Sequence, residues 1–206
     1  MTSVRRSGTK GVARADREEQ ILEAAGRVFG AQGFAATSVA DVARAAGISK
    51  PLIYNYFGSK EGLFERCLRV ASELLVGEIE RSAQLGAVGL QRALVTLDGV
   101  FHVLDDRPWA WAVANDPTAP DVDGLGDLIG AYRRRLEELA REGVGELLTI
   151  AGDDDQLDLD AMTSVWSSVF ASLVTWWCAH PDVSPEAMSE RCERLFGAVF
   201  GVGLDA

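Results

Sequence analysis

Residues 37–64 read TSVADVARAAGISKPLIYNYFGSKEGLF, and this stretch decides the fold. Thr37 or Ser38 can cap a short helix, and Gly47 suits the left-handed conformation in which such a helix commonly ends. Only a tight turn follows before Ser49, which can cap a second short helix. Two helices of about two turns each, joined across one glycine, predict a helix-turn-helix unit.

Helical periodicity continues on both sides of this unit. Before it, apolar side chains recur at the spacing of one buried stripe, which predicts a helix over about residues 16–32 that Gly33 ends. After it, Ser59 can cap a long helix that runs to about residue 82. This long helix would connect the two halves of the chain.

From residue 86 onward the spacing is again helical, with no strand of convincing alternation and no internal repeat. A segment over about residues 158–180 has aromatic and aliphatic side chains on two faces and small ones on the third, which predicts a helix buried nearly all round. The last helix should present Met188, Cys192, Leu195 and Val199 in line. A short apolar helix is expected between Pro108 and Pro117. Two further helices are indicated by apolar stripes, one at Leu90, Leu94, Leu97, Phe101 and Leu104 and the other at Leu125, Ile129, Tyr132, Leu136 and Leu139.

The composition is that of a globular protein, with 48% hydrophobic and 25% charged residues among 206. The longest nearly apolar run, around residues 164–179, is shorter than the roughly 20 residues of a membrane span. No apolar segment follows the basic N-terminal residues, so we expect neither a secretory signal nor an anchor. Three widely spaced cysteines argue against a disulfide framework or a zinc site, and a cytoplasmic location is expected.

The net charge of −11 is unevenly distributed. Residues 1–66 contain 10 lysines and arginines against 7 acidic residues, while residues 67–206 contain 10 against 24. Only the N-terminal part is therefore expected to approach a polyanion, because the rest would repel it. Residues 1–15 have four basic residues, no acidic ones and no apolar periodicity, which predicts a flexible basic arm.

The residues do not favour an enzyme or a metal protein. There are only two histidines, His102 and His180, and no nucleophile motif, phosphate-binding glycine loop or cluster with metal-ligand spacing. The run GDDDQLDLD at residues 152–160 does not fit a calcium loop, because Asp158 and Ser164 stand where glycine and glutamate are required. Acids that precede a helix, favoured by its dipole, are the better interpretation. We expect no catalytic residue, no metal and no cofactor.

The second short helix carries side chains that suit a nucleic acid. Leu52, Ile53 and Phe57 can point toward the preceding helices. Short polar and aromatic side chains at the start of such a helix can reach base edges and phosphates in the major groove, although each aromatic residue alone would more often belong to a core. Lys60, near the start of the next helix, can hold a phosphate. The side chains left for solvent or a ligand are Lys50, Pro51, Tyr54, Asn55 and Tyr56.

Residues 17–70 resemble the N-terminal domain of the TetR family of bacterial transcriptional regulators. The stretch ILEAAGRVFGAQGFAATSVADVARAAGISKPLIYNYFGSKEGLF matches the family's first helix, its second helix and turn, and its Y-x-Y-F-x-S-K-E-x-L ending. Val42 replaces the commoner isoleucine and Ile48 the commoner valine. Lys50, Pro51 and Leu52 replace small residues at positions where such families vary their operator choice.

The resemblance implies a set of DNA-binding residues. Thr37, Tyr56 and Lys60 would hold phosphates, and Lys50 and Asn55 would be the best hydrogen-bonding candidates for base edges. The basic arm would reach a flanking minor groove or further phosphates, or would remain a solvated tail. The full set is Thr37, Ser49, Lys50, Pro51, Leu52, Tyr54, Asn55, Tyr56 and Lys60.

The resemblance ends near residue 80, and the rest depends on the residues. All five tryptophans lie after residue 108, where they could line an apolar cavity for a small molecule or simply fill the core. His102 lies about 120° from the apolar stripe of its helix, so it would hydrogen-bond a ligand or be a polar edge residue. The candidate ligand-binding residues are Phe101, His102, Trp109, Trp111, Tyr132, Trp166, Phe170 and Trp177.

The resemblance also implies a homodimer, because the family pairs its last two helices into a four-helix bundle. The small side chains of Ser164, Ser168, Ala171 and Thr175 would allow close approach there, or could pack within the subunit. The expected partners are an operator in double-stranded DNA, a small-molecule effector and a second copy of the chain, with no membrane.

We therefore expect an all-α protein with three parts: a basic arm (1–15), a three-helix helix-turn-helix DNA-binding domain (16–62) and a helical effector-binding and dimerisation domain (63–206). The expected function is that of a repressor that binds a palindromic operator as a dimer and is released by a small apolar or aromatic effector. The alternatives are an activator of the same family and an architectural DNA-binding protein without an effector.

Overall fold

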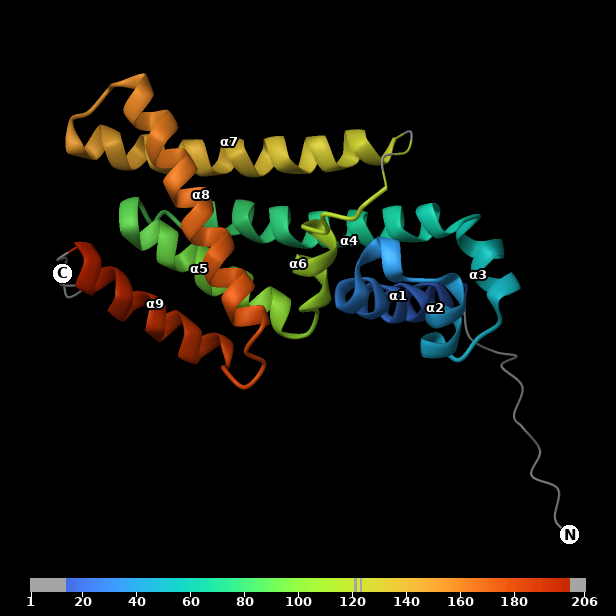
Figure 1. Cartoon of the computed structure of the whole chain (residues 1–206). Coiled ribbons are helices and arrows are strands. Elements are labelled where there is room, and N and C mark those ends of the chain that lie inside the picture. The colour runs from blue at the N-terminus through green and yellow to red at the C-terminus, as the bar shows by residue number, and fades with distance from the viewer. Residues whose placement is uncertain (1–13, 121, 123, 201–206) are drawn as a thin grey trace, which may run out of the picture.

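The computed structural model describes residues 14–120, 122 and 124–200, and within that part the regular structure is entirely α-helical (Figure 1), which confirms the predicted fold class. The three N-terminal helices gather at one end, α4 and α7 run side by side along the molecule, and α8 and α9 lie away from α3 (Figure 1). The helices are α1 (Arg14–Ala36), α2 (Val39–Ala46), α3 (Lys50–Phe57), α4 (Lys60–Ala83), α5 (Gly89–Asp105), α6 (Trp109–Ala114), α7 (Leu125–Ala151), α8 (Gln156–Cys178) and α9 (Pro185–Phe200).

The helix-turn-helix unit consists of α2 and α3, as the sequence predicts. Ser38, rather than Thr37, caps α2: its hydroxyl accepts the N–H of Asp41 at 3.3 Å, and the Asp41 carboxylate accepts the N–H of Ser38 at 3.1 Å. This is a capping box. Hydrogen bonds from the hydroxyl and then the N–H of Ser38 hold the pKa of Asp41 below its usual value. Gly47 ends α2 in the left-handed conformation, with φ at 66°.

The first helix departs from its predicted bounds at both ends. It begins at Arg14, so Arg14 and Ala15 belong to α1 rather than to the predicted arm, of which residues 1–13 lie outside the described residues. At Gly33 the helix breaks, with φ 76° and ψ 164°, and one further turn continues to Ala36. Glycine is required there because this backbone conformation is essentially closed to other residues.

The core of the N-terminal domain is continuous with that of the C-terminal part. Phe64 of α4 packs its ring 5.1 Å from the rings of both Phe29 and Phe34. The same helix then passes on to contacts with α5 and α7. The predicted boundary after residue 62 therefore falls inside α4, which continues across it without a break.

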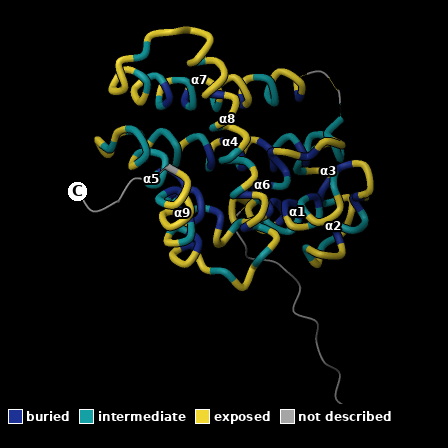
Figure 2. The backbone as a smooth tube through the Cα atoms, turned by 60° about the vertical axis from the view of Figure 1, so that its left-hand side comes forward, coloured by how far each residue is buried: buried dark blue, intermediate teal, exposed yellow. Residues whose placement is uncertain are grey.

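Helices α5 and α7 bury the stripes that their spacing predicts, and α9 packs on α5. Buried residues concentrate where α1, α4, α5 and α6 meet, whereas much of α8 is exposed (Figure 2). The fully or nearly fully buried members of the two stripes are Leu97, Phe101 and Leu104 in α5 and Leu125, Tyr132 and Leu139 in α7.

Two expectations about the last helices are wrong for the single chain. Helix α8 is not buried nearly all round, because only one side of it packs on α5, α6 and α7; Val165 remains 56% exposed. In α9 the buried stripe is Met188, Cys192 and Phe196, whose spacing of four residues keeps them on the side that faces α5. Leu195 and Val199, which the sequence places in line with them, are exposed.

Candidate DNA-binding face and effector region

Helix α3 is anchored by one fully buried residue and presents the rest of its surface outward. Ile53 has no exposed surface, whereas Tyr54 is 49% exposed. Proline in the first turn is tolerated because the N–H that it lacks would have no partner within the helix. Among the predicted DNA contacts, Ser49, Lys50, Pro51 and Asn55 are exposed, and Leu52 and Tyr56 are half-buried.

Lys60 lies at the first position of α4, next to the end of α3. Ser59 caps α4 by accepting the N–H of Gly62 at 2.9 Å. The Lys60 ammonium lies 4.0 Å from the centre of the Phe34 ring, which is within the range of a cation–π interaction. The aromatic ring therefore holds a positive charge at a helix N-terminus, where the helix dipole also favours an anion.

Thr37 differs from the other candidates because its side chain is buried. Only 3% of the residue is exposed, and its hydroxyl donates to the carbonyl of Gly33 at 2.8 Å. In this structure the hydroxyl supports the turn between α1 and α2. A phosphate contact through it would require this hydrogen bond to be given up.

Arg14 is a candidate that the sequence does not single out, because there it counts as one of four charges in an arm. Its guanidinium lies 5.0 Å from the centre of the Tyr56 ring, on the exposed side of α3. The contact joins residues 42 positions apart, so only the packing of α1 against α3 could reveal it.

The structure brings most of the predicted effector residues into ring contact. Trp111, on α6, packs against Phe170 at 6.2 Å between ring centres, and Trp166 packs against the same ring at 6.2 Å. Phe101 and Trp177 form a second pair at 5.2 Å. The Trp111–Phe170 contact joins α6 to α8 and the Phe101–Trp177 contact joins α5 to α8, whereas the Trp166–Phe170 contact lies within α8.

Tyr132, on α7, is a buried polar residue. It is 5% exposed, and its hydroxyl has no hydrogen-bond partner among the described residues. Burial raises the pKa of this phenol well above its usual value. An unpaired buried hydroxyl costs free energy that a polar ligand atom could recover.

Trp109 and His102 lie apart from the rest of the predicted set. Trp109 packs on α1, and its ring N–H donates to Glu23 at 3.1 Å. His102 is exposed on α5, where Nδ1 lies 2.8 Å from the carbonyl of Asp98 and Nε2 lies 3.5 Å from the Glu186 carboxylate of α9. This histidine is the polar edge residue that the sequence leaves open as the alternative.

Two hollows of the surface lie along α1 rather than among the aromatic pairs. One, of about 310 Å³, lies between α1, α4 and α6 and has Trp109 in its wall. The other lies between α1, the end of α2 and the end of α5. Neither is lined by the ring contacts of α5, α6 and α8.

The acidic run before α8 acts as a helix start. The Asp155 carboxylate accepts the N–H of Leu157 at 2.7 Å and caps α8. Within the described residues no group of histidine, cysteine and acidic side chains could hold a metal ion. In the same part of the chain no helix is long and apolar enough to cross a membrane.

Comparison with known proteins identifies the N-terminal domain. Residues 21–67 match the family model described as bacterial regulatory proteins, tetR family. The chain carries a TetR-family domain. The match covers α2, α3, most of α1 and the start of α4, which are the helices that present the exposed face of α3.

The relatives that this chain resembles are transcriptional regulators. BetI of Rhizobium meliloti is 43% identical over 123 residues, covering 58% of this chain and 60% of that protein. The repressor KstR2 of Mycolicibacterium smegmatis is 25% identical over 137 residues, covering 64% and 67%. The chain thus spans about two thirds or less of the length of these curated relatives.

Solved TetR-family structures share the fold over nearly the whole chain. A regulator from Bordetella parapertussis superposes with a TM-score of 0.73 at 26% identity, covering 89% of this chain and 95% of that one. The ketosteroid regulator KstR2 of Mycobacterium tuberculosis superposes with a TM-score of 0.74 at 20% identity, covering 93% and 96%. The C-terminal helices therefore follow the arrangement of these structures as well.

Proposed function

We propose that the protein is a cytoplasmic, homodimeric transcriptional repressor that binds a palindromic operator and is released by a small apolar or aromatic effector. The observation that carries this proposal is the exposed face of α3 within a TetR-family domain, with Lys50 and Asn55 in solvent. Polar side chains on such a helix have the reach to contact base edges in the major groove.

In the proposed complex α3 enters the major groove, and the residues around it hold the backbone. Lys50 and Asn55 read base edges, and Tyr54 contacts a base or sugar nearby. Tyr56, Lys60 and Arg14 contact phosphates on the flank of the groove. Ser49, Pro51 and Leu52 shape the surface that meets the groove, and Thr37 supports the preceding turn.

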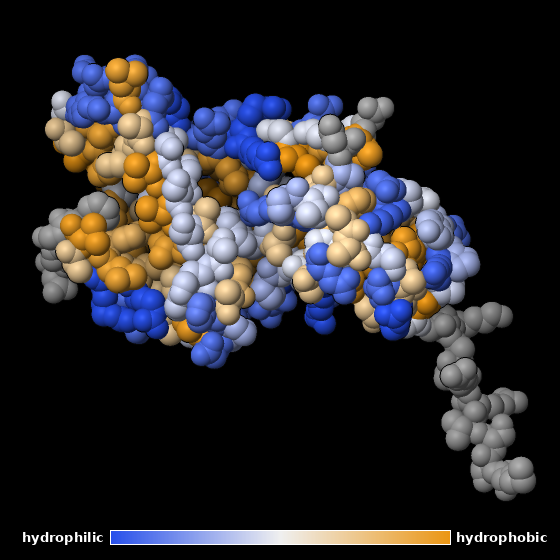
Figure 3. All heavy atoms as spheres, viewed as in Figure 1, coloured by the Kyte–Doolittle hydropathy of each residue, from blue (hydrophilic) through white to orange (hydrophobic). Residues whose placement is uncertain are grey.

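The proposed dimer forms through α8 and α9. Apolar residues gather over these two helices (Figure 3), and several of them are exposed. Grouped exposed apolar residues are typical of a surface that binds another protein. A second copy would cover them by two-fold symmetry and place two α3 helices about one turn of DNA apart. The exposed apolar residues on α8 and α9 are Leu157, Met162, Val165, Trp176, Leu195 and Val199.

The proposed effector enters the region of Phe101, Trp111, Tyr132, Trp166, Phe170 and Trp177. Trp111, Phe170 and Trp166 pack ring against ring, as do Phe101 and Trp177, so a ligand would have to separate such pairs. The buried Tyr132 hydroxyl of α7 would offer the ligand a polar anchor. FadR of Bacillus subtilis, a structure with the same fold at a TM-score of 0.66 and 18% identity, holds stearoyl-CoA. The fold can thus admit a ligand with a long apolar chain.

We propose a repressor rather than an activator, although the relatives include proteins named as repressors and as activators. KstR2 of Mycolicibacterium smegmatis is named a repressor, whereas FasR of the same organism, 30% identical over 112 residues, is named an activator. Repression and activation differ in whether binding to the operator lowers or raises transcription. A reporter fused to the operator would separate them, since repression requires expression to rise when the protein is removed.

The first test is selection of random duplexes by the purified protein, followed by sequencing. An enriched palindrome would support a dimeric, sequence-specific regulator. Salt-sensitive binding without any enriched sequence would overturn the proposal and favour an architectural protein that reads only the DNA backbone.

A further inference from the structure

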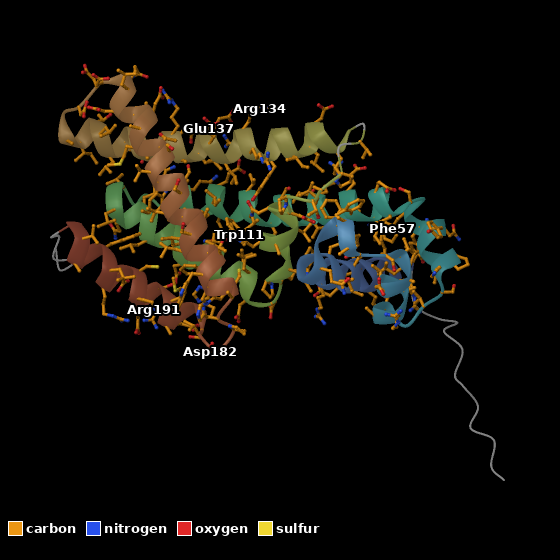
Figure 4. All side chains as sticks on the ribbon, viewed as in Figure 1. Phe57, Trp111, Arg134, Glu137, Asp182 and Arg191 are labelled. Carbon is orange, nitrogen blue, oxygen red and sulfur yellow. The ribbon has the colours of Figure 1, made fainter. Side chains whose placement is uncertain are left out.

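Helix α6 bridges the N-terminal domain and α8. Trp109 and Trp111 are two residues apart, so they point to opposite sides of the helix. Trp109 packs on α1, whereas the ring N–H of Trp111 donates to the Thr175 hydroxyl of α8 at 2.9 Å. Figure 4 labels Trp111 beside α8. Helix α6, only six residues long, therefore contacts α8 through Trp111 and α1 through Trp109.

The contact between α6 and α1 is close at two glycines of α1. A Cβ atom at Gly26 would lie 2.4 Å from the Trp109 ring, and one at Gly30 would lie 3.1 Å from the Cβ of Trp109. Arg107, just before α6, pairs with Glu19 at 3.3 Å. The surface of α6 that carries Trp109 is thus closely packed on α1.

Beyond α6 the chain makes a second attachment, at the break in α1. The Asp116 carboxylate accepts the backbone N–H of Phe34 at 2.6 Å, and the Thr118 hydroxyl accepts the N–H of Ala35 at 3.1 Å. Asp116 is buried, and its other carboxylate oxygen accepts both the N–H and the hydroxyl of Thr118, at 2.8 and 2.7 Å. We call Asp116 and Thr118 the latch.

The latch holds backbone groups that the break at Gly33 leaves without helical partners. The N–H groups of Phe34 and Ala35 follow Gly33 directly, as the first donors of a helical turn do. The same turn continues into Thr37, whose hydroxyl donates to Gly33 and whose N–H donates to the carbonyl of Phe34 at 3.2 Å. Helix α2 begins two residues later.

We propose that Asp116 and Thr118 are positioning residues through which the C-terminal domain sets the orientation of α2 and α3. This inference rests on the proposed function, since orientation matters only if α3 reads an operator. When α6 moves with Trp111, the hydrogen bonds from the latch to the backbone turn after Gly33 break. The two α3 helices of a dimer then lose the spacing that a palindrome requires. The route is separate from α4, which connects the same two regions as a continuous helix.

The test compares four variants of the full chain. Thr118→Val removes the exposed hydroxyl that accepts the N–H of Ala35. Asp116→Asn removes the charge of the group that accepts the N–H of Phe34 and so weakens that hydrogen bond. Thr118→Ser keeps the hydroxyl and serves as the rescue. Asp106→Asn is the matched control, because it removes an exposed carboxylate at the end of α5.

Two properties are measured. The first is the affinity for the operator duplex obtained by selection and for a random duplex, each over a range of salt concentrations. The second is hydrogen exchange of the backbone amides in the free protein. In Thr118→Val and Asp116→Asn, operator affinity should fall by roughly 5- to 150-fold, the range of allosteric coupling. Random-duplex affinity and its salt slope should stay unchanged, because no phosphate contact is lost. The Phe34 and Ala35 amides should exchange about tenfold faster or more. Thr118→Ser and Asp106→Asn should remain within about twofold of the wild type.

The outcomes separate this inference from the proposed function. Operator affinity that stays within about twofold in both latch variants, while exchange at Phe34 becomes faster, would overturn the inference and leave the repressor intact. An equal loss of operator and random-duplex binding, together with a lower melting temperature, would also overturn it, because the latch would then be merely structural. A wild-type protein that selects no operator would overturn the proposed function, and the inference with it.

Discussion

Asn55 is the exposed residue best suited to discriminate between bases, because an amide can pair with adenine through two hydrogen bonds. Replacing it by alanine should change operator preference at one position of each half-site by about 1–3 kcal/mol. Selection of random duplexes by Asn55→Ala, compared with the wild type, measures this directly. A uniform loss of affinity for all sequences would instead make Asn55 a positioning contact.

Lys60 and Arg14 should each neutralise one phosphate, since an aromatic ring holds each charge beside α3. Lys60→Gln or Arg14→Gln should weaken binding to every duplex and reduce the slope of log affinity against log salt by about 1. Arg81→Gln is the control, because Arg81 lies on α4 some 30 Å from Lys60 by helix length. An unchanged slope in either variant would remove that residue from the phosphate set.

At the level of elements, α6 packs on α1 so closely that position 26 has no room for a side chain. Gly26→Ala would place a methyl group against the Trp109 ring, whose N–H is held by Glu23. This overpacking should lower the free energy of unfolding by about 1–3 kcal/mol. Denaturant unfolding measures it.

Gly77→Ala is the matched control for that substitution. Gly77 lies inside α4, and a Cβ there would meet no atom within 4 Å. This variant should be stabilised by roughly 0.4–1 kcal/mol, because alanine restricts the unfolded chain. Equal effects of the two substitutions would show that α6 does not pack tightly on α1 in solution.

The contact between α5 and α9 should depend on pH through His102. The carbonyl of Asp98, followed by the Asp98 and Glu186 carboxylates, raises the pKa of His102 above its usual value. Its stabilising effect is therefore fully present below about pH 6.5, the unfolded value, and is lost as the pH rises through the higher folded value.

His102→Gln removes this effect, so the variant should melt at a lower temperature than the wild type at pH 5.5 and at nearly the same temperature at high pH. Glu186→Gln should reduce the pH-dependent difference without abolishing it, because Asp98 remains. Thermal melting between pH 5.5 and 9 measures both variants. A difference that does not change with pH would contradict the assigned role of His102.

At the level of the whole molecule, the apolar surface of α8 and α9 should control assembly. Val165→Glu or Leu195→Glu would bury a charge in the proposed interface and should convert a dimer to a monomer at micromolar concentration. Analytical ultracentrifugation measures the change. Leu85→Glu, an equally exposed leucine after α4, is the control and should remain dimeric. A dimer that survives both α8 and α9 substitutions would place the interface elsewhere.

The sequence predicts local features because neighbouring residues determine them. The cap at Ser38, the left-handed Gly47 and the bounds of α3 each depend on residues within one or two turns of the chain. The stripes of α5 and α7 follow from spacing for the same reason. The exposed side of α3 is accordingly readable from the order of the residues alone.

Contacts between residues far apart in the sequence decided the features that local sequence does not specify. Burial of Thr37, the separation of Trp109 and His102 from the other effector residues, and the Arg14–Tyr56 contact depend on how distant helices pack. The latch joins residues more than 80 positions apart. No periodicity in a sequence specifies which backbone N–H groups a distant carboxylate will reach, because that depends on the relative placement of whole helices. The sequence by itself thus determined the helical fold class and the helix-turn-helix unit, because both depend on neighbouring residues. The tertiary structure decided which distant residues contact the turn between α1 and α2, because that depends on how whole helices pack.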